Sequence, residues 1–248
     1  MTTTVLRNGA RSDDPRLGRL PPPDWRHVEK YPLRGLAAAE RPSRVPVVLG
    51  INWYAGFDRP ERLGNGTRYA SWWIGRGDLG RLRGGHAICA EFGGSGDTAA
   101  WYRFYDQGVE GACVGYAWSR AMTLLNRRRY DAEWLYRMAQ KSDEWPGEAY
   151  AGTSVRAAAD VLSTAGHRRL RAARVDPERP EDGISVYRWA TTVEQVHEAL
   201  GDAYADRIGA VPLLNSWGGK YPQRVWLPDE TLARLLREDG EATIPTDR

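Results

Sequence analysis

The order in which strand-like and helix-like patterns follow one another is the feature that most constrains this fold. Three segments in the first part of the chain are short, rich in β-branched and aromatic residues, and bounded by turn residues, which is typical of buried strands. They are residues 45–54 (VPVVLGINWY), 69–74 (YASWWI) and 86–92 (HAICAEF). The sequence therefore predicts that part of a sheet forms before any long helix.

The pattern then changes to apolar residues three and four apart, which predicts helices. These helical segments begin near Cys113 and continue through residues 115–129, 132–145, 154–167 and 191–201. Thr153 and Ser154 are candidate caps for the third of them. Strand patterns return at residues 210–217 and 223–228, and residues 229–239 predict a closing amphipathic helix. Strands, helices and strands in this order predict an α+β fold.

The chain has 248 residues, which is enough to bury the core of one domain or of two lobes. Residues 1–44 are rich in Pro, Arg and Ala and predict an extended N-terminal arm. We expect residues 45–248 to form a single domain. Within it, residues 45–100 and 205–248 are expected to be mainly β and residues 106–200 mainly helical.

Composition excludes several classes of function. Lys and Arg total 35 against 32 for Asp and Glu, and this near balance predicts neither a nucleic-acid partner nor a membrane surface. No apolar window of about 18 residues is present, so no membrane span is expected. The two cysteines, Cys89 and Cys113, are too few for a disulfide framework or a four-thiolate zinc site. We expect no metal, no cofactor and a reducing, cytoplasmic setting.

Cys113 stands where a glycine-containing loop turns into a helical pattern. Gly111 and Ala112 precede it, and Gln107 lies six positions earlier (113 − 107 = 6). The N–H groups and dipole of a helix N-terminus stabilise a thiolate, which is the form of cysteine that attacks carbonyl groups. Taken alone, a cysteine is more often a small buried hydrophobe, so its neighbours decide the interpretation.

The segment from Gln107 to Cys113 resembles the active-site segment of papain-like cysteine peptidases, where a Gln, a Gly, two variable residues, a Gly and a small residue precede the nucleophile. The resemblance implies a helical lobe and an antiparallel β-barrel-like lobe. It also implies that Cys113 is the nucleophile and that Gln107, with the Cys113 N–H, forms the oxyanion hole.

Two further motifs resemble the same family. Asn215, Ser216, Trp217 and Gly218 match its Asn-Ser-Trp-Gly signature, and Gly84-Gly85-His86-Ala87-Ile88 resembles its His-Ala strand. The resemblance implies that His86 is the base, that Asn215 orients the imidazole, and that Trp217 shields their hydrogen bond. Gly111, Gly152 and Trp217 are the residues expected to line the substrate cleft.

The chain departs from the family in the order of its motifs. Papain-like enzymes carry Cys, then His, then Asn, whereas here His86 precedes Cys113 and Asn215 comes last. We therefore expect a rearranged, permutation-like topology. Glu110 stands where many members have a disulfide-bonded cysteine, as suits a reducing compartment.

Other residues have simpler interpretations. Cys89 lies an odd number of positions after His86 and would point to the other face of a strand, so it is expected in the core. His167 and His197 are expected to be solvated, and Asn215 alone would fit a turn.

Two functions remain. One is thiol-dependent hydrolysis of a peptide or protein substrate, with acyl transfer to an amine as a variant of the same chemistry. The other is a catalytically silent structural or binding protein of a phage or prophage, located in the host cytoplasm or virion. The sequence predicts no oligomeric state.

Overall fold

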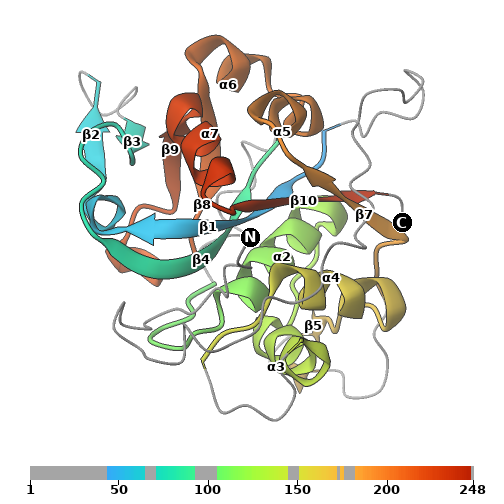
Figure 1. Ribbon diagram of the computed structural model, residues 1–248. Helices are drawn as coiled ribbons and strands as arrows, with labels where there is room; N and C mark the ends of the chain where they lie inside the picture. The colour runs from blue at the N-terminus through green and yellow to red at the C-terminus, as the bar shows by residue number, and fades with distance from the viewer. Residues whose placement is uncertain are drawn as a thin grey trace.

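The computed structural model describes residues 44–64, 71–92, 105–144, 151–171, 174–175 and 182–246. The expected arm of residues 1–44 lies outside this part of the chain, apart from Arg44. The described residues combine helices with a large sheet, which confirms the α+β class (Figure 1). No described helix is both long enough and apolar enough to cross a membrane.

Eight of the described strands form one sheet, in the order β2-β3-β9-β8-β4-β1-β10-β7. Their bounds are Val47–Tyr54 (β1), Glu61–Leu63 (β2), Ser71–Trp73 (β3), Leu82–Ala90 (β4), Val186–Ala190 (β7), Ala210–Leu214 (β8), Arg224–Pro228 (β9) and Glu241–Thr246 (β10). Neighbouring strands are antiparallel except β3 and β9. A separate short ribbon pairs Leu170–Arg171 (β5) with Arg174–Val175 (β6). The sheet is therefore assembled from both ends of the described chain, with the helical segment between them.

Helices cover both faces of this sheet (Figure 1). One face carries Cys113–Asn126 (α2), Ala132–Ser142 (α3) and Val155–Thr164 (α4), and the other carries Val193–Leu200 (α5), Ala203–Ile208 (α6) and Asp229–Arg237 (α7). Two short 3-10 helices, Ala55–Asp58 (η3) and Gly218–Lys220 (η5), follow β1 and precede β9. The result is a layered molecule in which the sheet separates two hydrophobic cores.

The alternation of side chains along β1 and β4 explains the two cores. On β1, Val47, Leu49 and Ile51 pack with α5 and α7, whereas Val48 faces the opposite side with the α2–α4 helices. Successive side chains of a strand point to opposite faces, so a strand buried on both sides is a continuous apolar run. This is why VPVVLGINWY has no polar alternation in its first half and still forms a central strand.

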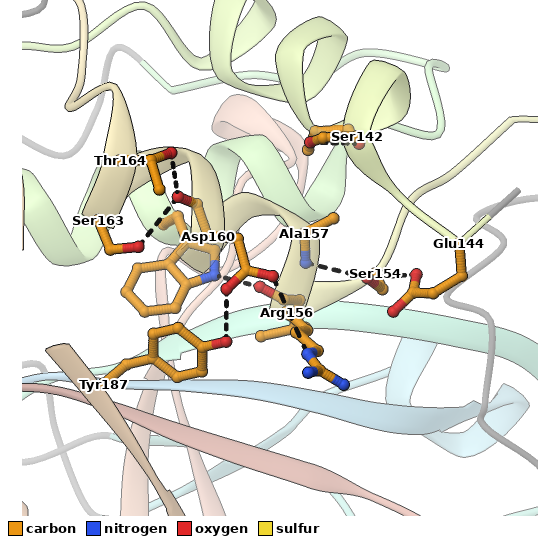
Figure 2. A network of polar contacts seen from close by, with 12 residues as sticks. Ser142, Glu144, Ser154, Arg156, Ala157, Asp160, Ser163, Thr164 and Tyr187 are labelled. Atoms are coloured by element: carbon orange, nitrogen blue, oxygen red, sulfur yellow. Dashed lines mark hydrogen bonds and ion pairs between the residues drawn. The ribbon is translucent and has the colours of Figure 1, made fainter. Parts of the chain in front are cut away.

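Helix α4 illustrates how the helices are fixed to the sheet (Figure 2). Ser154 is its N-cap, as predicted: its Oγ accepts a hydrogen bond from Ala157 N at 3.0 Å and donates one to Glu144 Oε2 at 3.1 Å. Further along, the Asp160 carboxylate accepts a 2.6 Å hydrogen bond from the Tyr187 hydroxyl. Tyr187 belongs to β7, so this contact joins α4 to the edge of the sheet.

One expectation about the last third of the chain was wrong, and three short elements there were not predicted. The helix of residues 229–239 does not close the fold, because β10 follows it and pairs between β1 and β7. Strand β7 lies in the stretch expected to be mainly helical, and α6 was not predicted. These elements are short and mixed in polarity: β10 carries Glu241 and Pro245, and α6 has only six residues. Neither length gives a periodic pattern enough repeats to be recognised.

Candidate active site

The site forms where strand β8 stops pairing with β4. The two strands are paired at Cys89–Leu214 and Ala90–Leu213, and the N–H of Glu91 donates to Pro212 O at 3.0 Å. Backbone N–H groups of alternate residues point to the same neighbour, so the Ala87 N–H faces the same side, beyond the end of β8. Its acceptor is the Sγ of Cys113, at 3.3 Å. The Cys113 thiol thus accepts the hydrogen bond that a further residue of β8 would otherwise have accepted.

Helix α2 places this thiol. Cys113 is its first residue, and the N-cap, Ala112, provides no side-chain hydrogen bond to the helix. The backbone N–H groups of Ala87, Val114 and Cys113 all lower the pKa of the thiol, although burial is the larger effect and raises it to about 11. Cys113 is only 1 % exposed. The helix start therefore supplies the expected electrostatic support, but in a desolvated setting that favours the neutral thiol.

His86 lies on β4 next to Ala87, and its side chain points to the face of the strand opposite to that of Ala87. Its Nε2 is 3.1 Å from Asn215 Oδ1, which makes Nε2 the donor and leaves Nδ1 as the basic nitrogen. Nδ1 is buried and has no hydrogen-bond partner among the described residues. Burial lowers the pKa of His86 to about 4, and the bond to Asn215 opposes this shift. A neutral imidazole with an uncommitted basic nitrogen is the state in which histidine accepts a proton.

Two aromatic rings contact the imidazole, and a third packs behind them. The Trp217 ring lies 4.9 Å from that of His86 at an angle of 42°, and the Trp53 ring meets it edge-on at 4.7 Å. Tyr221 packs edge-on against Trp217 at 5.0 Å, and its hydroxyl donates to Phe57 O at 2.8 Å. His86 and Asn215 are both buried beside these rings. The sequence did not single out Trp53, because a strand pattern does not distinguish an aromatic residue beside a histidine from any other core residue.

Gln107 is brought to the same region by a backbone contact. Its N–H donates to Ser216 O at 2.9 Å, which ties the loop before α2 to the Asn215–Ser216 segment. The side-chain Nε2 donates to Glu110 O at 3.0 Å, and Oε1 has no hydrogen-bond partner among the described residues. Because an amide nitrogen carries two N–H groups, Gln107 retains one donor beyond the bond to Glu110.

Gly111 and Gly152, which the resemblance predicts to line the cleft, pack close to each other. A Cβ on Gly111 would come within 3.0 Å of Ala151 and 3.2 Å of Gly152 N, so the loop before α2 packs closely on this second segment. The N–H of Gly152 donates to the Tyr136 hydroxyl at 3.0 Å, and its φ of +131° favours glycine. Its role in the cleft stays a prediction.

Arg120 is a further residue of this region that the sequence patterns did not single out. Arg120 is 1 % exposed and lies seven positions after Cys113 on α2 (120 − 113 = 7). Its Nη2 donates to Asn215 O at 2.7 Å and its Nε to Ser216 Oγ at 2.9 Å. Seven residues are about two helical turns, so this spacing places Arg120 and Cys113 on one face of the helix and was the available signal.

The expectation that His167 and His197 are solvated was wrong. His167 is fully buried, accepts or donates a 2.8 Å hydrogen bond with Ser119 Oγ, and is stacked on the Tyr130 ring at 4.7 Å. His197 is 7 % exposed and contacts Asp229 Oδ1 at 2.8 Å. The arginines around His167 in the sequence point elsewhere, and His197 lies on the buried side of α5. Cys89 is buried on the α2 face of β4, as expected.

The described residues contain no group of three or more His, Cys, Asp and Glu side chains arranged to hold a metal ion. They place the Cys113 thiol at the Ala87 N–H and the Asn215 carboxamide at His86 Nε2, on two consecutive residues of β4. Nδ1 of His86 makes no hydrogen bond to the thiol, so a proton passes between them only if the two side chains move closer.

Comparisons with known proteins add one distant likeness. No protein-family model matches the chain, and no curated protein does. Among solved structures, the chain resembles xylellain, a cysteine protease from Xylella fastidiosa, with a TM-score of 0.45 and 14% identity over 59% of this chain and 83% of that one. A likeness at this level carries no argument about fold or activity, so the functional conclusion rests on the site.

Proposed function

We propose that the chain is a papain-like cysteine peptidase or related amide hydrolase in which Cys113 is the nucleophile, His86 the base and Asn215 the orienter. The observation that carries the proposal is the arrangement around β4. The His86 Nε2 is held by Asn215 Oδ1 at 3.1 Å, and the peptide N–H of the next residue, Ala87, is held by Cys113 Sγ at 3.3 Å. Two segments distant from each other in sequence, at Cys113 and at Asn215, thus meet at one dipeptide.

The proposed reaction uses the residues in fixed roles. Nδ1 of His86 takes the thiol proton as Cys113 Sγ attacks the substrate carbonyl carbon, and the carbonyl electron pair moves to oxygen. The Cys113 N–H and the second N–H of Gln107 stabilise that oxyanion. Collapse breaks the C–N bond, and the amine leaves with the proton from His86. Water then hydrolyses the thioester, giving its proton to His86, and the thiol is restored.

The finer features of the fold belong to this proposal. We infer a papain-like architecture with a barrel-like β lobe in which the strand bearing His86 precedes the helix bearing Cys113 in the chain. A sheet can keep its strand positions while the connections reroute over the surface, so the order of motifs does not oppose the assignment. Peptides or proteins are the proposed substrates, and Trp217, Gly111 and Gly152 the proposed cleft residues.

The burial of the site favours a second candidate, a catalytically silent binding protein. Cys113 and His86 are each 1 % exposed, and burial moves the pKa of each toward its neutral form. A substrate carbonyl reaches the sulfur only when this site opens. A protein that keeps the site closed would retain the geometry without the reaction.

Alkylation of the thiol tests the proposal. We would treat the native protein with iodoacetamide at pH 6 and follow each cysteine by peptide mass spectrometry, in the wild type and in His86→Ala. An ordinary thiol with a pKa of about 8.5 is almost wholly protonated there and reacts slowly. We expect labelling of Cys113 that falls by about 100-fold or more in the variant.

Cys89 is the internal control for this experiment, because it is buried behind the same helix and its pKa is also raised by burial. Equal and slow labelling of both cysteines, unchanged in His86→Ala, would reject hydrolysis and support the silent protein.

A further inference from the structure

The side chain of Arg120 connects the helix of the nucleophile to the segment of the orienter. From α2, its Nη2 donates to the backbone oxygen of Asn215 at 2.7 Å and its Nε to Ser216 Oγ at 2.9 Å. Nη2 also approaches Tyr105 O at 3.5 Å, and the guanidinium lies 5.4 Å from the centre of the Tyr105 ring. A long cationic side chain is thus fully buried, and charged side chains are rarely buried unless they are paired or hydrogen-bonded.

The held segment is the one that fixes the imidazole. Asn215 Oδ1 accepts from its neighbour Ser216 N at 2.7 Å and faces His86 Nε2 at 3.1 Å. A shift of the Asn215 backbone therefore displaces the oxygen that orients His86. Strand β8 ends at Leu214, and the Asn215 N–H makes one further backbone hydrogen bond, to Gln223 O at 3.2 Å. Arg120 supplies side-chain hydrogen bonds to this segment from helix α2.

We infer that Arg120 is a positioning residue of the active site, which sets the distance between the helix bearing Cys113 and the Asn215 that orients His86. The inference rests on the proposed function. Arginine suits this task because its planar guanidinium directs donors at two acceptors at once, whereas lysine is a point charge on a flexible stem. Catalytic groups displaced by about 1 Å lose up to about 100-fold in rate.

The inference predicts that Arg120 acts through Asn215. Arg120→Met should lower the rate of Cys113 alkylation at pH 6 by about 10- to 100-fold, and Arg120→Lys should recover only part of the loss. In an Asn215→Ala background, Arg120→Met should add less than about a threefold further loss, because the carboxamide it positions is gone.

The matched control is Trp118→Phe. Trp118 is a fully buried residue of the same helix, and its Nε1 donates to Val155 O at 3.0 Å, away from Asn215. This variant should lose stability while keeping the wild-type alkylation rate and its pH dependence. For Arg120→Met the acidic limb of the rate profile should move to lower pH, as it should in Asn215→Ala, since the bond to Asn215 raises the pKa of His86.

Should Arg120→Met fail to fold by circular dichroism, Ser216→Ala replaces it, because it removes only the acceptor of the Nε hydrogen bond. A loss of about 2- to 10-fold, absent in the Asn215→Ala background, is then expected. If the losses in alkylation rate of the two single variants multiply in the double variant, the positioning role is overturned while the proposed function stands. The same holds if the acidic limb of the rate profile does not move. Slow, His86-independent labelling of the wild type overturns both.

Discussion

The Sγ of Cys113 accepts the backbone N–H of Ala87, the residue that follows His86. The proposed nucleophile is therefore tied to the strand that carries the proposed base, and the contact depends on β8 ending at Leu214. Because the thiol occupies a backbone hydrogen-bonding position, the sheet fixes where Sγ lies relative to β4.

Removing the thiol separates catalysis from packing. Cys113→Ala should abolish hydrolysis of a denatured protein substrate, while Cys89→Ala should retain most of it, since Cys89 packs on the α2 face of β4 without touching the proposed reaction. Gel and mass-spectrometric assays of product peptides check this. Equal activity in wild type and Cys113→Ala would assign the cleavage to another group or to a contaminant.

The acid limit of activity follows from His86. Burial lowers its pKa to about 4, so the imidazole stays neutral and able to accept the thiol proton down to that pH. Below it a proton occupies Nδ1 and the base is lost. We expect kcat/KM, which reports the free enzyme, to fall about tenfold per pH unit below about pH 4. A limb near pH 6.5, the ordinary histidine value, would contradict the buried state.

Gly218 is the glycine of the Asn-Ser-Trp-Gly motif, and its conformation explains its identity. Its φ is +59°, and a Cβ there would collide with the Asp106 carboxylate. Gly218→Ala should cost about 1–3 kcal/mol in the free energy of unfolding. Chemical denaturation measures this.

The neighbouring Gly219 provides the control for that substitution, because a Cβ on it meets nothing within 4 Å. Gly219→Ala should stay within about 0.5 kcal/mol of the wild type. If the two variants unfold at the same denaturant concentration, the turn does not require glycine.

The buried His167 makes stability depend on pH. Burial lowers its pKa to about 3, whereas the unfolded chain binds that proton near pH 6.5. Between these values the unfolded state holds more protons, so the free energy of unfolding falls as pH falls. His167→Gln should remove up to about 1.4 kcal/mol per pH unit of that slope between pH 6 and 4. Parallel curves for variant and wild type would show that His167 does not titrate as a buried group.

Local patterns predicted much of this molecule. β1 and helices α2–α5 and α7 carry clear periodicity, and Ser154 was a recognisable cap. The features that local patterns missed depend on contacts between segments distant in sequence. His167 stands among arginines in the sequence and looks solvated, yet its ring stacks on Tyr130. Arg120 shares a helix face with Cys113, but the local pattern does not reveal its acceptors, because Asn215 and Ser216 are 95 and 96 positions away.

Two of the motif residues were easier to place, because each lies at the end of an element. Cys113 opens α2, and Asn215 follows β8 directly. Their convergence with His86 depends on which strands are neighbours, and the order β8-β4-β1-β10 is a property of the whole chain. No local window of sequence contains it.

Strand β10 pairs with β1 on one side and β7 on the other, although residues 241–246 are synthesised almost 190 positions after β1 (241 − 54 = 187). A growing chain therefore leaves the backbone edges of both strands unpaired until these residues leave the ribosome. Domains usually fold from the N-terminus during synthesis, and unpaired strand edges promote aggregation. This protein must complete its sheet after translation of β10, so the yield of native molecules in cells should depend on chaperones that shield β1.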